Sequence, residues 1–171
     1  MKKLLPVFIL TLFCEVTSAQ DQYQVMSERP NEKTFKGIIS REALTGDTSF
    51  HWYASNLKGY SPNKQALEGL KMHKDTLQFL VFMGTWCDDS QYIIPKFFTL
   101  LDIAGFSPDR VTLIGVDRQK KTLSHLTEAL NVKNVPTIIV LKDGVELGRV
   151  VEYGKTGLFD KDLADIFQSV K

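Results

Sequence analysis

The feature that most constrains the fold is a nearly continuous apolar run at residues 77–83, where Gln78 is the one polar side chain. A strand with one face in water alternates apolar and polar residues with a period of two. A run without that alternation is typical of a strand buried on both faces, as in a parallel sheet. We therefore expect residues 77–83 to lie at the centre of a sheet that is covered by helices.

Other periodic segments follow this run. A strongly apolar helical pattern extends to about Ala104, with Gly105 as its expected end, and Pro95 inside it should kink the helix. Beyond it we expect a buried strand over 111–116, a helix capped by Thr122, a hairpin over 136–151 and an amphipathic helix from about Leu158. The sum is an α/β sandwich with a mixed central β-sheet flanked by helices.

The N-terminal half divides into three stretches. Residues 1–19 resemble an export signal, with a basic start, an apolar run of about ten residues that is too short to span a bilayer, and a small-residue cleavage site. Residues 20–35 are polar without a sustained period and predict a flexible lead-in. Residues 36–76 carry short helical patterns, including an aromatic stripe typical of core packing, and form an N-terminal extension to the domain at 77–171.

Charge and cysteine content narrow the possible partners. The chain has 171 residues and a net charge of +1, and removal of residues 1–19 takes away two lysines and one glutamate. The mature chain would be neutral, which argues against nucleic acid as a partner. The same cleavage removes Cys14 and leaves Cys87 as a single thiol, which cannot form an internal disulfide. Such a thiol in an oxidising compartment must be buried, be paired with another molecule, or take part in the protein's chemistry.

Cys87 lies at the junction between the central strand and the helix that follows it. Backbone N–H groups and the helix dipole favour a thiolate there, so we expect a nucleophile. Asp88 and Asp89 suit the first turn of a helix, although carboxylates disfavour a neighbouring negative charge. We expect Ser90 to donate its hydroxyl hydrogen to the sulfur. It cannot replace a second thiol, because a hydroxyl is a far poorer nucleophile at neutral pH.

Three motifs in this order resemble the thioredoxin family over about residues 77–171: Trp86-Cys87-x-x-Ser90, Pro95 in the following helix, and Val135-Pro136-Thr137 before a hairpin. Within that family the chain is similar to exported thioredoxin-like proteins of Gram-negative bacteria. The resemblance implies a thioredoxin-like three-layer sandwich and a periplasmic or other extracytoplasmic location, with no membrane contact after signal cleavage.

The resemblance also implies a substrate groove. Its residues would be Trp86, Val135, Pro136 and Thr137, with a cis Val135–Pro136 peptide bond against Cys87 and the Val135 backbone offering an edge to a polypeptide. The buried acid that is frequent in the family's central strand falls on Val81 here. This chain therefore lacks both the second thiol and the usual proton relay.

Two functions from different classes fit these residues. The first is thiol–disulfide exchange through one nucleophilic cysteine, of the isomerase or mixed-disulfide type, on a polypeptide or low-molecular-weight thiol or disulfide. The second is a redox-inactive binding module that captures a polypeptide. A thiol peroxidase ranks last, because the threonine and proline arrangement around a peroxidatic cysteine is missing. No cofactor is expected, and His51, His73 and His125 fall on separate elements without metal-ligand spacing. The oligomeric state stays open.

Overall fold

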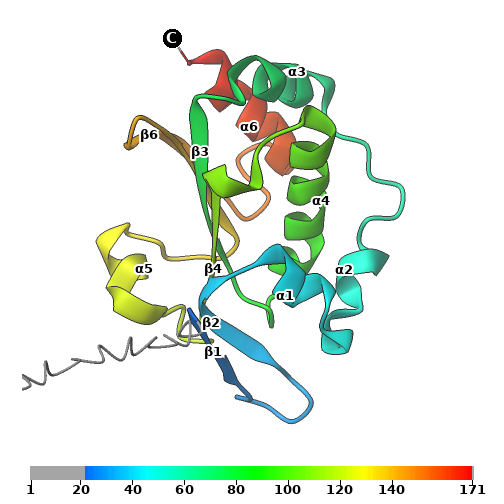
Figure 1. Cartoon of the computed structure of the whole chain (residues 1–171), viewed down its shortest axis with the longest axis vertical. Coiled ribbons are helices and arrows are strands. Elements are labelled where there is room, and N and C mark those ends of the chain that lie inside the picture. Colours follow the sequence, from blue (N-terminus) through cyan, green and yellow to red (C-terminus); the bar gives the residue numbers. More distant parts are fainter. Residues whose placement is uncertain (1–21, 171) are drawn as a thin grey trace, which may run out of the picture.

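Residues 22–170 are described by the computed structural model, and their strands form one six-stranded sheet in the order β1-β2-β4-β3-β5-β6 (Figure 1). The β3 and β4 strands run parallel, and every other neighbouring pair runs antiparallel. The strands are β1 (Tyr23–Met26), β2 (Thr34–Ile39), β3 (Leu77–Met83), β4 (Val111–Gly115), β5 (Thr137–Lys142) and β6 (Val145–Val151).

Helices cover both faces of this sheet, which confirms the predicted α/β sandwich (Figure 1). Five helices lie on one face and α5 lies on the other. The helices are α1 (Arg41–Thr45), α2 (Trp52–Ser55), α3 (Lys64–His73), α4 (Asp88–Ala104), α5 (Leu126–Ala129) and α6 (Phe159–Gln168), with single 3₁₀ turns η1 (Thr48–Phe50), η2 (Pro108–Arg110) and η3 (Leu123–His125).

The central strand β3 coincides with the predicted run 77–83 and contacts two hydrophobic cores. Phe79 and Val81 belong to the larger core, which lies against α3, α4 and α6. Leu80 and Phe82 contact the smaller core, which lies on the side of α5. The absence of alternation in the sequence therefore has the predicted cause, since both faces of this strand are covered.

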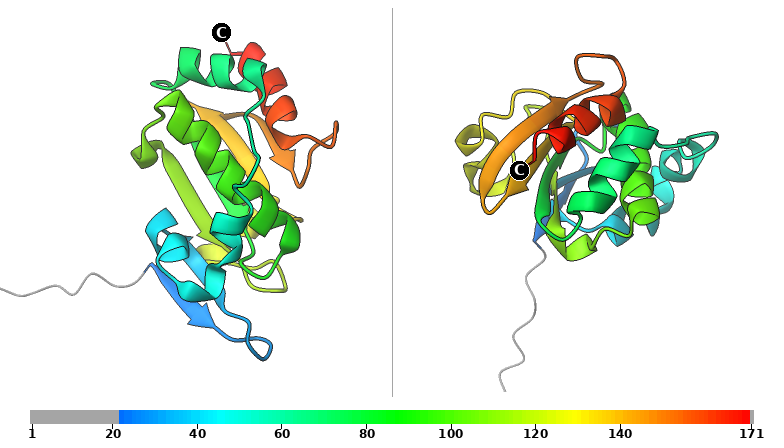
Figure 2. Two further views of the ribbon diagram at one scale, coloured as in Figure 1. Left: turned by 90° about the vertical axis from the view of Figure 1, so that its right-hand side faces the viewer. Right: turned by 90° about the horizontal axis from the view of Figure 1, so that it is seen from above.

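The N-terminal strands belong to the same sheet, at its edge (Figure 2). The prediction of a flexible lead-in over residues 20–35 is wrong, because β1 and the start of β2 lie within this stretch. Backbone pairing with β2 and the packing of Tyr23 on Phe35, with ring centroids 4.8 Å apart, hold β1. β2 in turn pairs with β4, where a Cβ added at Gly115 would stand 2.1 Å from the carbonyl oxygen of Phe35. An edge strand of this kind needs no apolar period, because main-chain hydrogen bonds supply its contacts.

Helix α4 begins after Cys87 and ends at Gly105, whose φ of 67° is left-handed, as predicted. Helical turns follow Thr122 as predicted, but its side chain does not cap them. The Thr122 hydroxyl instead donates to the carbonyl oxygen of Gly115 at 2.8 Å, and positive φ angles at Ser124 and His125 interrupt the segment before α5. The predicted export signal lies outside the described residues. No helix at 22–170 is long and apolar enough to cross a membrane.

Candidate functional site

Cys87 is the N-cap residue of α4 and is half-buried, with extended backbone angles of −95° and 120°. Its N–H donates to the carbonyl oxygen of Gly84 at 3.0 Å, which closes the turn between β3 and α4. It is the only cysteine in the described part of the chain, and it is free. The side chain therefore stands at the positive end of the longest helix, where an anion is stabilised.

The structure brings the predicted groove residues together around this thiol. The Cys87 Sγ donates to the carbonyl oxygen of Val135 at 3.3 Å, and the Val135–Pro136 peptide bond is cis. The carbonyl oxygen of Pro136 accepts from the Glu152 N–H at 2.7 Å, and the Thr137 hydroxyl donates to the backbone carbonyl of Asn134 at 2.7 Å. Residues 134–137 are therefore held by a hydrogen bond from the turn after β6 and by another within the segment.

These residues are close to the thiol but covered. Val135 is 2% exposed and Thr137 is 1% exposed, so the Val135 backbone does not form the open edge that the resemblance implies. Trp86 is half-buried, and its Nε1 donates to the carbonyl oxygen of Val116 at 3.0 Å. The accessible part of the site is therefore made by residues 86–89 and not by residues 135–137.

Ser90 does not contact the thiol in the way the sequence predicts. Its side chain is fully buried, and its Oγ accepts from the Gly84 N–H at 3.2 Å. Among the described residues, no hydrogen bond joins Ser90 to Cys87. The two side chains point in different directions. The Ser90 hydroxyl faces the backbone of Gly84, whereas the Cys87 Sγ faces the carbonyl oxygen of Val135. Ser90 thus holds the loop that carries Cys87.

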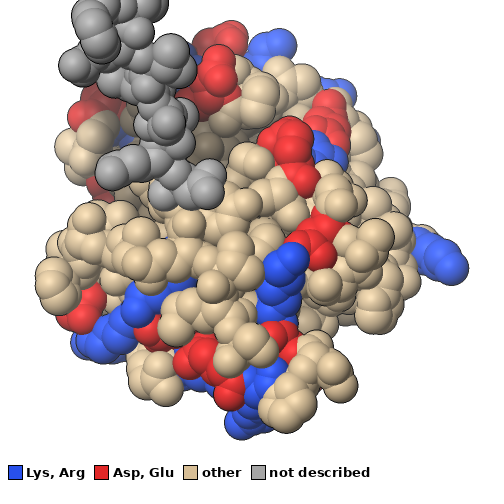
Figure 3. Space-filling view, turned by 60° about the horizontal axis from the view of Figure 1, so that its bottom comes forward, with Lys and Arg blue, Asp and Glu red and all other residues tan. Residues whose placement is uncertain are grey.

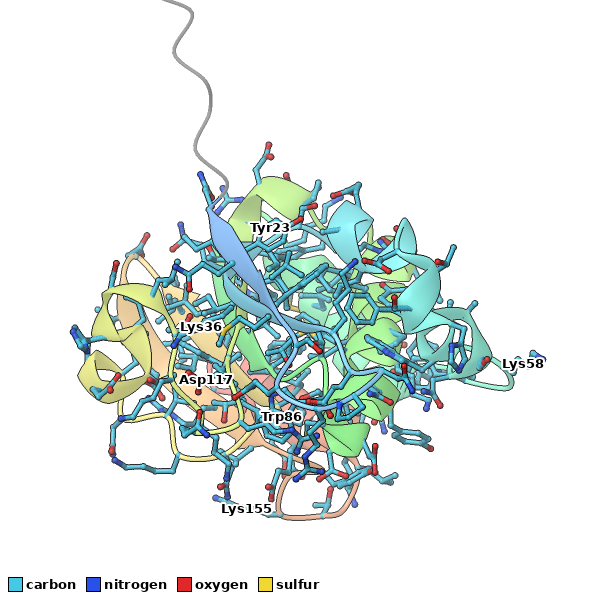
Figure 4. All side chains as sticks on the ribbon, turned by 90° about the horizontal axis from the view of Figure 1, so that it is seen from below. Tyr23, Lys36, Lys58, Trp86, Asp117 and Lys155 are labelled. Carbon is cyan, nitrogen blue, oxygen red and sulfur yellow. The ribbon has the colours of Figure 1, made fainter. Side chains whose placement is uncertain are left out.

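A charged pair lies near Trp86, although no acid stands at Val81. The Lys36 Nζ donates to Asp117 Oδ2 at 2.6 Å, and the Lys121 N–H donates to Asp117 Oδ1 at 2.8 Å. Figure 4 shows Lys36, Asp117 and Trp86 next to one another at this end of the sheet. The pair crosses from β2 to the loop after β4, so it fastens the N-terminal extension beside the site.

Arg118 is a site residue that the sequence analysis missed. Its guanidinium lies 5.0 Å from the Trp86 ring and donates two hydrogen bonds to Glu32, one of them 2.8 Å long. These bonds hold the pKa of Glu32 below its ordinary value and raise the pKa of Arg118. Its place in the sequence indicates this role, because Arg118 follows β4 just as Cys87 follows β3. The ends of parallel strands meet at one edge of a sheet.

A pocket of about 790 Å³ opens beside Cys87. Its walls are the 29–33 loop, the 49–52 segment, the start of α4 and Arg118. Figure 3 shows that Lys and Arg side chains alternate with Asp and Glu on the lower face of the molecule, without a field of one sign. No group of side chains in residues 22–170 has the composition of a metal site. The pocket suits a ligand that carries both charges more than a polyanion.

Tyr153, in the turn after β6, lies near Asp89 and Tyr92 and does not line this pocket. Burial raises the pKa of its hydroxyl, and the carboxylate of Asp89 adds to that effect. The Tyr153 ring stands 5.9 Å from the ring of Tyr92, so two aromatic side chains border this side of α4.

The site therefore combines a single thiol at a helix N-terminus, a cis X–Pro bond against it and a mixed sheet, which define a thioredoxin-like protein. Over 84 residues the chain is 30% identical to a thioredoxin from Echinococcus granulosus, a match that covers 49% of this chain and 73% of that protein. The chain belongs to the thioredoxin family. No model of a known protein family matches it.

Two solved structures share the fold. An HIV epitope-scaffold has a TM-score of 0.55 at 17% identity, covering 77% of this chain and 93% of its own. A protein of unknown function from Pseudomonas aeruginosa has a TM-score of 0.53 at 17% identity, covering 75% of this chain and 90% of its own. Both matches reach beyond the 84 residues of the thioredoxin match. The similarity thus extends to part of the N-terminal region.

Proposed function

We propose that this protein is an exported thioredoxin-like protein that catalyses thiol–disulfide exchange through Cys87 alone. The observation that carries the proposal is the free, half-buried thiol at the N-cap of α4, with its Sγ 3.3 Å from the Val135 carbonyl oxygen. That position supplies a helix dipole for the thiolate and solvent access for a partner.

The cycle needs no second cysteine in the chain. The Cys87 thiolate attacks one sulfur of a disulfide, a Cys87–substrate S–S bond forms, and the other substrate sulfur leaves as a thiolate that takes up a proton. A thiol from the same substrate or from a small molecule then loses its proton and attacks the substrate sulfur of the mixed disulfide. Cys87 leaves as a thiolate, and the number of disulfides is unchanged. The products are rearranged disulfides, which corresponds to isomerisation or deglutathionylation.

The shape of the site bears on the substrate. An extended polypeptide would have to pair with Val135, but that residue is 2% exposed and its carbonyl oxygen is engaged by Cys87. The pocket of about 790 Å³ on the other side is open to the thiol and carries both charges on its walls. We therefore favour a low-molecular-weight disulfide, or a disulfide on a protruding loop, as the substrate.

The test is turnover of a mixed disulfide between glutathione and a short cysteine peptide, with reduced glutathione as the second thiol. We expect wild-type protein to accelerate release of the peptide at least about tenfold over the same concentration of free cysteine, and Cys87→Ser to match the blank. Intact-mass spectrometry under non-reducing conditions should find one glutathionyl adduct on wild-type protein. Absence of both adduct and turnover would leave the redox-inactive binding module as the better description.

Export is the second part of the proposal and rests on residues 1–19. Expression of the full chain in a Gram-negative host should yield a periplasmic product whose N-terminus is at or close to Gln20. A product that retains Met1 in the cytoplasm would contradict export and leave the exchange chemistry untouched.

A further inference from the structure

A second pocket, of about 570 Å³, lies away from the thiol between the α2–α3 connection, α4 and the β6–α6 loop. Figure 2 shows that connection running along α4. Cys87 is not among its walls. Asn56 lines this second pocket, and Gln91 lines the pocket beside Cys87. The hydrogen bond from the Asn56 side chain to the Gln91 carbonyl oxygen lies between the two pockets. A ligand here would not occupy the exchange site.

The wall of this pocket contains a buried lysine without a counter-charge. Lys96 is 6% exposed, and its Nζ donates to the carbonyl oxygen of Tyr92 at 3.2 Å and stands 2.9 Å from the centroid of that ring. Within residues 22–170 it forms no salt bridge, and burial lowers the pKa of its ammonium group. The Lys96 ammonium group has three N–H donors, and one carbonyl oxygen and one ring face do not use all of them. A buried ammonium group is unfavourable unless an anion pairs with it.

The other charges of the pocket do not take that role. Asp160 Oδ2 accepts from the Tyr60 hydroxyl at 3.0 Å and from the Asn63 N–H at 2.9 Å, so its hydrogen bonds go to the α2–α3 connection and not to Lys96. Lys58 is exposed, and Figure 4 shows it extending outward from the molecule. Lys96 is therefore the buried cation that remains for an incoming group.

The rest of the wall combines aromatic and aliphatic side chains with the polar side chains of the α2–α3 connection. Tyr92, Tyr153 and Leu158 are 45%, 36% and 58% exposed, so large hydrophobic side chains face solvent around the entrance. Flat aromatic walls favour a planar apolar body, which stacks on tyrosine rings. The combination of one buried cation and aromatic walls matches the usual anatomy of a small-molecule site.

We propose that this pocket binds an aromatic carboxylate, with the carboxylate on the Lys96 ammonium group and the ring against Tyr92, Tyr153 and Leu158. A free aromatic acid and the C-terminal residue of a peptide present the same chemistry. The proposal goes beyond the exchange reaction and does not depend on Cys87.

The test is titration of the full chain, in the Cys87→Ser background, with N-acetylphenylalanine and with its amide, followed by amide chemical shifts in NMR spectra. We expect shifts at Tyr92, Gly157 and Leu158 with the acid, and at least about tenfold weaker binding of the amide. Lys96→Met should weaken the acid at least about tenfold and leave the amide unchanged, whereas Lys58→Met, which removes a charge at the rim, should change either by less than about twofold.

Equal affinity for acid and amide would overturn the proposal, as would unchanged binding to Lys96→Met or shifts confined to residues 86–89. A pentapeptide with a free C-terminal phenylalanine separates the two sources of the ligand. Binding of the pentapeptide as tight as that of the free amino acid supports a peptide terminus, and exclusion of the pentapeptide supports a free acid. Lys96→Arg keeps the charge, so retained binding by this variant would separate loss of the cation from a folding defect.

Discussion

The side-chain amide of Asn56 donates a hydrogen bond of 3.1 Å to the backbone carbonyl oxygen of Gln91. In an uninterrupted helix that carbonyl would accept from the N–H four residues later, but residue 95 is Pro95, which has no N–H. The N-terminal extension therefore supplies a donor that the helix next to Cys87 lacks.

This pairing predicts that Asn56→Ala lowers the free energy of unfolding by about 1–3 kcal/mol, because it leaves the carbonyl of Gln91 without a partner. Pro95→Ala restores an N–H, so in that background the cost of Asn56→Ala should fall below about 0.5 kcal/mol. Chemical denaturation of wild type, of each single variant and of the double variant measures the coupling between the two positions. Ser55→Ala, which removes an exposed hydroxyl bonded to the His51 carbonyl oxygen, is the matched control. Purely additive costs would contradict the explanation.

Ser90 separates a structural role from a chemical one. Ser90→Ala removes the acceptor of the buried Gly84 N–H, so we expect a loss of about 1–3 kcal/mol in stability. The alkylation rate of Cys87 by iodoacetamide should change by less than about twofold, because the hydroxyl does not contact the sulfur. Ser107→Ala, at an exposed position without a capping hydrogen bond, should affect neither quantity. A large fall in alkylation rate with unchanged stability would assign Ser90 to the thiolate.

The Glu32–Arg118 ion pair predicts a pH dependence. Arg118 holds the pKa of Glu32 below its ordinary value of 4.5, so the pair stabilises the fold above about pH 4.5 and the stabilisation is lost as the pH falls through the lower, folded-state pKa. Glu32→Gln should melt at a lower temperature than wild type at pH 7, and the two melting temperatures should converge in acid. Glu68→Gln, whose partner Lys64 is exposed and 3.9 Å away, should follow wild type at every pH. A constant difference between wild type and Glu32→Gln would contradict this assignment.

Gly115 tests whether the extension is part of the fold. Gly115→Ala would bring a Cβ to 2.1 Å from the Phe35 carbonyl oxygen and force β2 away from β4, at a cost of about 1–3 kcal/mol. Hydrogen exchange should accelerate at residues 34–39 before it does in β3. At Gly148 the corresponding contact is the Ile166 side chain at 3.1 Å, which can move, so Gly148→Ala should cost less. Equal costs would show that backbone approach is not the limiting feature.

Thr34 carries a hydroxyl that is buried and has no hydrogen-bond partner among the described residues. Thr34→Val removes that polar atom at nearly constant shape, and we expect it to raise the free energy of unfolding by about 1 kcal/mol. Thr122→Val is the counterpart, because its hydroxyl donates to the Gly115 carbonyl oxygen at 2.8 Å, and it should lose about 1–3 kcal/mol. Thermal melts of both variants, compared with wild type, measure these changes in stability. A destabilised Thr34→Val would indicate that the Thr34 hydroxyl has a partner.

The sequence by itself determined the parts whose signal is local. The apolar run of β3 and the left-handed Gly105 at the end of α4 were predicted, because periodicity and capping act within a few residues. Thr122 was misread because its hydroxyl bonds to Gly115, seven residues back and on another element. Capping preference is a local property, and a contact from elsewhere in the fold overrides it.

Only the tertiary structure decided what surrounds the thiol. The motif located Cys87, but the partner of Trp86 and the bond between Glu32 and Arg118 follow from the order of strands in the sheet. These contacts join segments up to 86 residues apart in the chain. Chain neighbours are fixed by covalent geometry, whereas neighbours in space depend on which strand ends the sheet brings together, and for that reason residue spacing alone could not assign them.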